Sequence, residues 1–263
     1  EEASRSWRCC GVTRWETLSR DPRRLVIEER LESVRRVVPV MGPKGGVGKT
    51  MVSALTALAL AEEGLRIGIF DLDVTNPSIH LTLGVDSRLK PSEERGVIPP
   101  EVWGVRVMSV AYYSEGNPLP LRGFELVDVV REMLAITVWG VLDYLIVDTP
   151  PGMSDIFMEV LNNVRRVEPL VVTTPSPLSL KPVKSLLKIL REVEVSVLGL
   201  VENMSDRPSE HVLSLCREHG VRYLGNVPND PFLNTSVGDV DTMRRTQAFR
   251  RVKELLRAQE LLR

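Results

Sequence analysis

The segment Lys44-Gly45-Gly46-Val47-Gly48-Lys49-Thr50 joins a short apolar run at residues 37–41 to an apolar stretch of helical character at residues 50–63. Backbone N–H groups at a helix N-terminus hold a polyphosphate well, and glycines let the chain pass close to its oxygens. The three glycines of this segment meet that need. The alternative is a glycine-rich turn that precedes Lys-Thr by chance. Such a turn would not require a strand before it and a helix after it. The segment therefore predicts a phosphate-binding loop.

The residue types in the loop predict individual roles. Lys49 is expected to reach the β- and γ-phosphates, and the Thr50 hydroxyl is expected to bind Mg²⁺. The ordinary loop has a glycine five positions before Gly48, but Pro43 stands there, so this is a variant in which Lys44 is the distinguishing residue. We expect the nucleotide to contact a continuous run of residues: Gly45, Gly46, Val47, Gly48, Lys49, Thr50 and Met51.

Three aspartates stand at the ends of apolar strands. Asp71 and Asp73 follow the strand predicted at residues 66–70, and Asp148 follows the strand predicted at residues 144–147. At the carboxyl ends of parallel strands such carboxylates lie beside a bound phosphate, where they bind Mg²⁺ directly or through water. Any one of them alone is equally well explained as a turn residue or a helix cap. Three beside a phosphate loop favour a magnesium site.

Apolar strands alternate with helices along the rest of the chain. Further strands are predicted at residues 105–110, 170–172, 195–201 and 222–224, and helices at 125–134, 178–192, 208–218 and 247–262. Strands that are apolar along their whole length and alternate with helices are typical of a parallel sheet buried on both faces. The sequence therefore predicts an α/β fold with a mostly parallel sheet and helices on both faces.

The domain organisation is predicted to be simple. Residues 1–20 are polar and aperiodic, which indicates a flexible lead. Asp21-Pro22 then supplies a helix cap and an initial proline, and apolar residues follow at loosely helical spacing: Leu25, Ile27, Leu31 and Val34. A chain of 263 residues with 43% hydrophobic content suits one sizeable α/β domain. Residues 21–263 are predicted to form it.

Charge, cysteine content and hydrophobicity limit the possible partners and the cellular compartment of the protein. The formal net charge is −1, from 34 basic and 35 acidic residues, so we expect no strong nucleic-acid footprint. Cys9, Cys10 and Cys216 are too few for a disulfide framework, which suits a reducing compartment. No apolar stretch approaches the ~18–20 residues that span a bilayer. These observations predict a cytoplasmic protein without a membrane anchor.

The phosphate loop resembles the deviant Walker A loop of the MinD/ParA group of P-loop ATPases. Four further stretches narrow the resemblance to the Mrp-type branch, which includes iron–sulfur cluster carriers. They are residues 71–79, which begin Asp-Leu-Asp; 121–123, Leu-Arg-Gly; 139–155, which contain Asp-Thr-Pro-Pro-Gly; and 199–205, which end Glu-Asn-Met-Ser. The resemblance covers about residues 37–250. It implies a P-loop NTPase fold that binds ATP or ADP with Mg²⁺ and hydrolyses ATP, slowly without a partner.

The resemblance also implies roles for individual residues. Lys44 resembles the lysine that crosses a nucleotide-sandwiched homodimer to touch the partner subunit's phosphates, and Asp73 resembles the residue that positions the attacking water. Asp71 and Asp148 resemble the carboxylates around magnesium. Asn203 and Pro228 resemble contacts on the adenine side. Gly152 resembles a hinge that senses the γ-phosphate, although a plain turn glycine explains it equally well.

The chain departs from the branch in its cysteines. Cluster-carrying members have Cys-x-x-Cys soon after the Asn-Met-Ser segment, and two such motifs across a dimer supply four thiolates for a [4Fe–4S] cluster. Here Ser205 is followed by residues without cysteine, and Cys216 is solitary on a predicted helix, where a buried, inert thiol is the commoner outcome. Two copies of Cys216 supply only two ligands. We therefore expect no stable cluster at the position that the relatives use.

Three functions remain open at the level of sequence. The first is an Mrp-type ATPase linked to iron–sulfur assembly through an unidentified protein client. The second is a MinD/ParA-like positioning or partitioning ATPase whose nucleotide-driven dimer binds a surface and a partner. The third is a regulatory nucleotide-binding module without turnover. The C-terminal stretch bears on the second, because its apolar and basic sides suit either a membrane surface or a helix packed on the sheet, and we favour the packed helix.

Overall fold

The computed structural model describes residues 21–86, 88–114, 121, 123–152, 155–164 and 166–259. The predicted lead at residues 1–20 lies outside this part of the chain. The helices are α2 (Arg23–Leu31), α3 (Lys49–Glu62), α4 (Ile79–Thr82), α5 (Ala111–Ser114), α6 (Phe124–Ile136), α7 (Asp155–Asn163), α8 (Pro177–Glu192), α9 (Glu210–His219), α10 (Pro231–Thr235), α11 (Val240–Arg244) and α12 (Gln247–Ala258). The strands are β1 (Val34–Met41), β2 (Ile67–Asp71), β3 (Ser92–Glu93), β4 (Val97–Ile98), β5 (Glu101–Val102), β6 (Val105–Ser109), β7 (Leu142–Asp148), β8 (Leu170–Thr173), β9 (Gly199–Glu202) and β10 (Tyr223–Asn226).

The main sheet has the strand order β10-β9-β8-β1-β7-β2-β6-β5, and its pairings are parallel except for β5 with β6. Strand β1 lies between β8 and β7, whereas β2, the next strand along the chain, lies beyond β7. The strand order therefore reverses at the carboxyl end of β1. In open α/β sheets this reversal forms the crevice that binds ligands.

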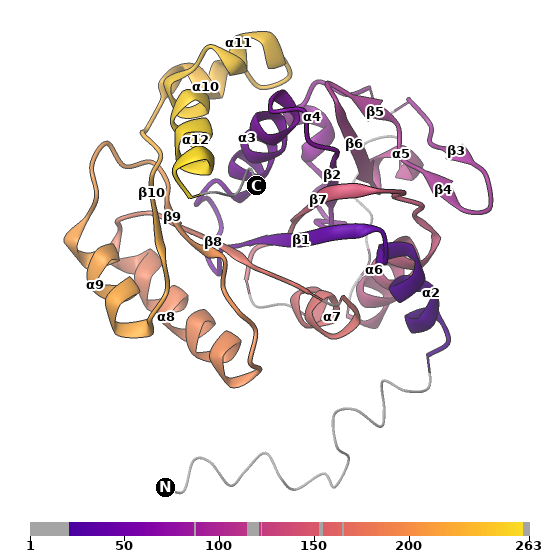
Figure 1. Cartoon of the computed structure of the whole chain (residues 1–263), viewed down its shortest axis with the longest axis horizontal. Coiled ribbons are helices and arrows are strands. Elements are labelled where there is room, and N and C mark those ends of the chain that lie inside the picture. The colour runs from indigo at the N-terminus through magenta and orange to yellow at the C-terminus, as the bar shows by residue number, and fades with distance from the viewer. Residues whose placement is uncertain are drawn as a thin grey trace, which may run out of the picture.

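Helices cover both faces of the sheet (Figure 1). Helices α3 and α12 pack together on one face, and α2, α6, α7, α8 and α9 lie on the other. The central strands β1, β2 and β7 are buried along most or all of their length, as continuous apolar parallel strands require. The predicted α/β fold, with a mostly parallel sheet and helices on both faces, is confirmed.

Some predicted boundaries are wrong for local reasons. The strand predicted at residues 195–201 begins only at Gly199. The chain turns at Glu194, whose φ is 58°, and Val195 and Val197 then pack on an apolar cluster without pairing in the sheet. Val34 belongs to β1 rather than to the first helix, which ends at Leu31. Helix α7 is absent from the prediction. It starts soon after a turn containing two prolines and buries Ile156, Phe157 and Val160.

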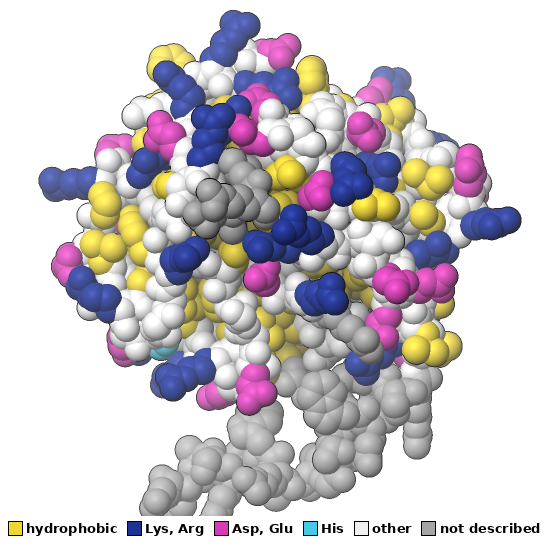
Figure 2. Space-filling model, viewed as in Figure 1, with side chains coloured by type: hydrophobic (Ala, Val, Ile, Leu, Met, Phe, Trp, Pro, Cys, Tyr) yellow, Lys and Arg dark blue, Asp and Glu magenta, His cyan; other side chains and the backbone are white. Residues whose placement is uncertain are grey.

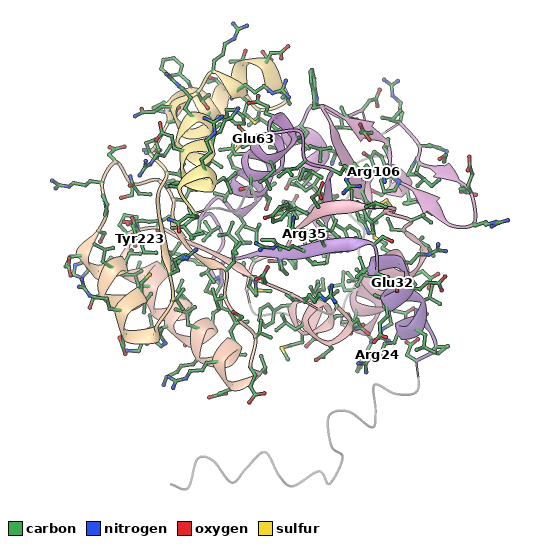
Figure 3. The ribbon with its side chains drawn as sticks, viewed as in Figure 1. Arg24, Glu32, Arg35, Glu63, Arg106 and Tyr223 are labelled. Atoms are coloured by element: carbon green, nitrogen blue, oxygen red, sulfur yellow. The ribbon has the colours of Figure 1, made fainter. Side chains whose placement is uncertain are left out.

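Helix α12 distinguishes the two interpretations of the C-terminal stretch, a membrane-surface helix and a helix packed on the sheet. Its apolar residues are buried: Phe249, Val252, Leu255 and Leu256. The helix contacts α3 and β10, and Arg257 donates at 2.7 Å to Glu63, which directly follows α3 and is labelled in Figure 3. Over residues 247–258 the helix is therefore packed on the fold, as predicted.

Charge on the visible surface is mixed in sign. Lys and Arg side chains are interspersed with Asp and Glu side chains on the face in Figure 2. Arg244, which could contribute to a basic patch, forms ion pairs with Glu62 and Asp241. None of the helices in the described part of the chain combines the length and apolar character that a membrane crossing requires.

Candidate nucleotide-binding site

The phosphate loop lies between β1 and α3, at the reversal of strand order. Gly46 and Gly48 have φ values of 77° and 83°, a left-handed conformation that favours glycine. At Gly42, just before the loop, an added Cβ would lie 2.9 Å from the Val172 carbonyl oxygen. The path of the loop therefore depends on glycine, and it brings the N-terminus of α3 to the carboxyl edge of the sheet, where backbone N–H groups can hold phosphate.

Lys49 and Thr50 form the first turn of α3. Lys49 is 7% exposed, and burial lowers the pKa of its ammonium, although Asp148 and Asp73 act in the opposite direction. A phosphate would add negative charge beside this buried cation. Thr50 Oγ1 donates to Asp148 Oδ2 at 2.7 Å. The structure thus brings together the hydroxyl and the carboxylate that the sequence assigns to magnesium.

Asp148 and Asp71 are register partners on β7 and β2. Burial raises the pKa of Asp148 to about 6, even though Thr50 and Ser53 donate to its two oxygens. Burial and the neighbouring Asp148 charge raise the pKa of Asp71. Two desolvated carboxylates side by side favour a cation between or beside them. A divalent metal beside Asp148 would offset this concentration of negative charge.

Asp71 has its oxygens turned to the protein. Oδ2 accepts from the N–H groups of Ser78 and Ile79 and from Ser109 Oγ, while Oδ1 accepts from the Asp73 N–H. The carboxylate is fully buried. Asp71 therefore fits a role in holding the backbone around the metal position, whereas Thr50 and Asp148 are better placed to touch a metal.

Asp73 and Lys44 are the more accessible charged groups of the site. Asp73 Oδ1 accepts from Thr75 Oγ1 at 2.9 Å and from the Asn76 N–H at 3.1 Å, which fixes the carboxylate at the start of a turn. Lys44 is exposed and forms no hydrogen bond or ion pair with the described residues. Its ammonium is therefore available to a group outside this subunit.

The predicted adenine contacts occupy two different places. Asn203 is buried beside the phosphate loop, where its Nδ2 donates to the Val47 carbonyl at 2.9 Å. Pro228 lines a polar pocket of about 430 Å³ at the end of β10, together with Asp206, Asn226, Gln247, Arg250, Arg251 and Glu254. All of these lining residues except Pro228 are polar or charged. Asn203 reaches the phosphate side, a contact that the sequence interpretation does not include.

Three further residues lie close to the site aspartates, in sequence or in space: Gly152, Ser53 and Ser109. Gly152 has a φ of 93°, and an alanine-like Cβ there would meet nothing within 4 Å, so only its backbone conformation calls for glycine. Ser53 and Ser109 are absent from the predicted site, although each donates to one of the site aspartates. Ser53 lies three residues after Thr50, which places both hydroxyls on one side of α3. This spacing can be read from the sequence and would have predicted that Ser53 lies beside Thr50.

Together, the loop at the strand reversal, the buried lysine and the Thr–Asp contact define a P-loop nucleotide-binding protein. A family model described as "ParA: NUBPL iron-transfer P-loop NTPase" matches residues 33–258. The chain belongs to this family.

Relatives and structures agree with this assignment. The chain is 34% identical to an iron–sulfur cluster carrier protein of Aquifex aeolicus over 62% of this chain and 46% of that protein. It is 37% identical to the human cytosolic Fe-S cluster assembly factor NUBP2 over 61% of this chain and 62% of that protein. The chain spans about half the length of the curated relatives it matches.

The solved structures extend the comparison to the fold. A nucleotide-binding protein from Archaeoglobus fulgidus in complex with ADP has a TM-score of 0.71 and 28% identity, covering 84% of this chain and 93% of that one. MinD from Pyrococcus horikoshii, complexed with Mg-ADP, has a TM-score of 0.62 and 21% identity, covering 86% and 96%. The second likeness shows the fold alone, which is that of the MinD/ParA P-loop ATPases.

Proposed function

We propose that the protein is a magnesium-dependent ATPase that acts as a homodimer in the cytoplasm and serves iron–sulfur cluster assembly through a protein client. The observation that carries this proposal is the contact between Thr50 and Asp148 beside the buried Lys49, because it joins a phosphate site to a metal site. The similarity to an iron–sulfur cluster carrier protein and to an Fe-S cluster assembly factor supports a client in iron–sulfur cluster assembly.

Each residue has a distinct part in the proposed reaction. Lys49 neutralises charge on the β- and γ-phosphates, and the loop N–H groups hold their oxygens. Bound Mg²⁺ would neutralise phosphate charge at Thr50 and Asp148, with Asp71 behind them. Asp73 orients the attacking water. The exposed Lys44 reaches the phosphates of the partner subunit, so hydrolysis requires the dimer and stays slow until a client favours it.

Mg-ATP and Mg-ADP are expected to stabilise the fold. At a concentration about a hundred times the dissociation constant, one-site binding adds roughly 2.7 kcal/mol to the free energy of unfolding. Urea unfolding with and without each nucleotide measures this difference. Lys49→Ala, which removes the phosphate-binding cation, is expected to lose most of it. An unfolding curve that neither Mg-nucleotide shifts would overturn the proposed binding site.

Measured turnover separates the ATPase from a regulatory module that only binds nucleotide. Phosphate release from Mg-ATP, dependent on both Mg²⁺ and Asp73, supports the enzyme. Nucleotide binding with no phosphate release under any dimerising condition would favour the module. The positioning ATPase gains no support from α12, whose apolar side over residues 247–258 is buried.

Cys216, the one cysteine in the described part of the chain, is a poor ligand for an iron–sulfur cluster. Cys216 lies on α9, is 4% exposed and packs in the apolar cluster with Val183 and Leu200. Burial, with a smaller contribution from the Glu202 charge, raises the pKa of its thiol to about 11. Cluster ligation requires accessible thiolates. We therefore propose that the protein acts in cluster assembly without a stable cluster in the position that cluster-carrying relatives use.

Anaerobic reconstitution with iron and sulfide tests this expectation. The purified protein is expected to retain no stable cluster after desalting, as measured by visible absorption and iron content. The double variant Cys9→Ser, Cys10→Ser is the control, because it removes the other two thiols of the chain. A bridging cluster with about four irons per dimer that disappears in Cys216→Ser would contradict the proposal.

A further inference from the structure

Asn203 links two parts of the molecule that are far apart in sequence. Its backbone N–H donates to the Thr173 carbonyl at 2.7 Å, which continues the pairing of β9 with β8. Its side-chain Nδ2 donates to the Val47 carbonyl of the phosphate loop at 2.9 Å. Because a carbonyl only accepts, the amide nitrogen must face the loop and Oδ1 must face away.

The contact with the loop is tight. A Cβ added at Gly48 would lie 2.3 Å from Asn203 Nδ2, so the amide occupies the space that a side chain at this position would need. Asn203 is 6% exposed, so the hydrogen bond is largely shielded from water. Loss of this bond leaves the Val47 carbonyl without its Asn203 partner in a buried place, which destabilises the loop.

The residue after Asn203 has a strained backbone. Met204 has a φ of 56°, a left-handed conformation that residues other than glycine, asparagine and aspartate adopt rarely. The chain is fixed on both sides of it. Asn203 is held by the phosphate loop, and Ser205 donates its N–H to the Val227 carbonyl at 2.9 Å and accepts from Asn226 Nδ2 at 2.7 Å.

The residue before Asn203 holds the far end of the following loop, residues 205–209. Glu202 is fully buried, and its Oε2 accepts from the Ser209 N–H at 3.1 Å and from the Tyr223 hydroxyl at 2.9 Å. Figure 3 labels Tyr223 on β10. The other oxygen, Oε1, has no hydrogen-bond partner among the described residues. The 205–209 loop is thus held at Ser205 by Asn226 and Val227, and at Ser209 by Glu202, the residue before Asn203.

We propose that Asn203 is a positioning residue that couples the phosphate loop to the 205–209 loop. A movement of Val47 when phosphate binds is transmitted through the Asn203 amide to strained Met204, and from there to the exposed residues 206–208. The nucleotide state therefore alters the accessibility of a surface loop. This inference deepens the proposed function and relies on nucleotide binding for its physiological meaning.

Hydrogen–deuterium exchange tests the coupling in two conditions. In nucleotide-free protein, Asn203→Ala is expected to speed exchange about 5- to 10-fold in peptides from both residues 44–50 and residues 205–209, a typical size for coupled sites. With Mg-ADP, wild type is expected to gain protection in both segments, while Asn203→Ala gains it only at residues 44–50. Asn234→Ala, an exposed change on α10, is the matched control and is expected to behave as wild type.

The outcomes separate this coupling from the proposed function. Unchanged exchange at residues 205–209 in nucleotide-free Asn203→Ala would overturn the coupling, even if nucleotide binds. Equal protection of residues 205–209 by Mg-ADP in wild type and in Asn203→Ala would also overturn it. A wild type that gains no protection at residues 44–50 refutes nucleotide binding instead, and the nucleotide-free comparison still decides the coupling. A Met204→Gly variant, which relieves the strained φ, is expected to weaken the link between the segments without removing the Asn203 bond.

Discussion

Replacing Gly48 with alanine is expected to reduce nucleotide affinity by at least about 100-fold, because two effects act on one position. The φ of 83° disfavours any side chain, and the new Cβ would lie 2.3 Å from Asn203 Nδ2. Either the loop or Asn203 must move, and loss of the loop N–H arrangement removes several phosphate contacts, each worth about 1.5–3 kcal/mol when the acceptor is charged. Isothermal titration with Mg-ADP measures the affinity.

Gly64→Ala is the matched control for the backbone effect. Gly64 follows α3 with a φ of 79°, but an added Cβ there would meet nothing within 4 Å. Both variants should lose about 1 kcal/mol of stability from the left-handed conformation. Only Gly48→Ala should lose nucleotide binding. Similar affinities in the two variants would mean that the loop does not hold phosphate in the way described.

Lys44→Ala is expected to keep nucleotide affinity within a few-fold of wild type and to lose hydrolysis by about 10³-fold or more, the scale of a cation supplied in trans to phosphoryl transfer. The reason is that Lys44 is exposed and forms no hydrogen bond or ion pair with the described residues of its own subunit. Phosphate release at saturating Mg-ATP measures the effect. Lys188→Ala, an exposed lysine on α8, is the control and should hydrolyse ATP at the wild-type rate. If Lys44→Ala hydrolyses ATP at the wild-type rate, Lys44 does not act on the phosphates bound by the partner subunit.

The central features of the fold could be predicted because they are local in sequence. The phosphate loop, its strand and its helix are continuous, and Asp71 and Asp148 end strands whose apolar runs are unmistakable. Parallel pairing then brings those strand ends together. Hydrophobic periodicity therefore predicts the sheet, and the phosphate-loop motif together with the strand ends places Asp71 and Asp148 beside the loop.

Other features depend on packing between distant segments. The Asn203 contact with Val47 joins residues 156 positions apart, and no local pattern indicates it. The capping of Ser78 and Ile79 by Asp71 depends on how the chain turns after β2. The strand at 195–201 is shorter than predicted because apolar Val195 and Val197 contact the apolar cluster that contains Cys216 without pairing in the sheet. Hydrophobicity alone cannot distinguish these two ways of burying a side chain.

Complementation between two inactive variants tests the central claim, an ATPase site completed by Lys44 of the partner subunit. In a mixed dimer of Lys44→Ala and Asp73→Asn, one site combines an intact Asp73 with an intact Lys44 from the other subunit, and the second site lacks both. Equal mixing of two variants in a two-fold dimer gives half mixed dimers, so about a quarter of wild-type turnover should return. Each variant alone should remain inactive. Phosphate release that stays at the level of the separate variants, although the mixed dimer forms, would contradict the account.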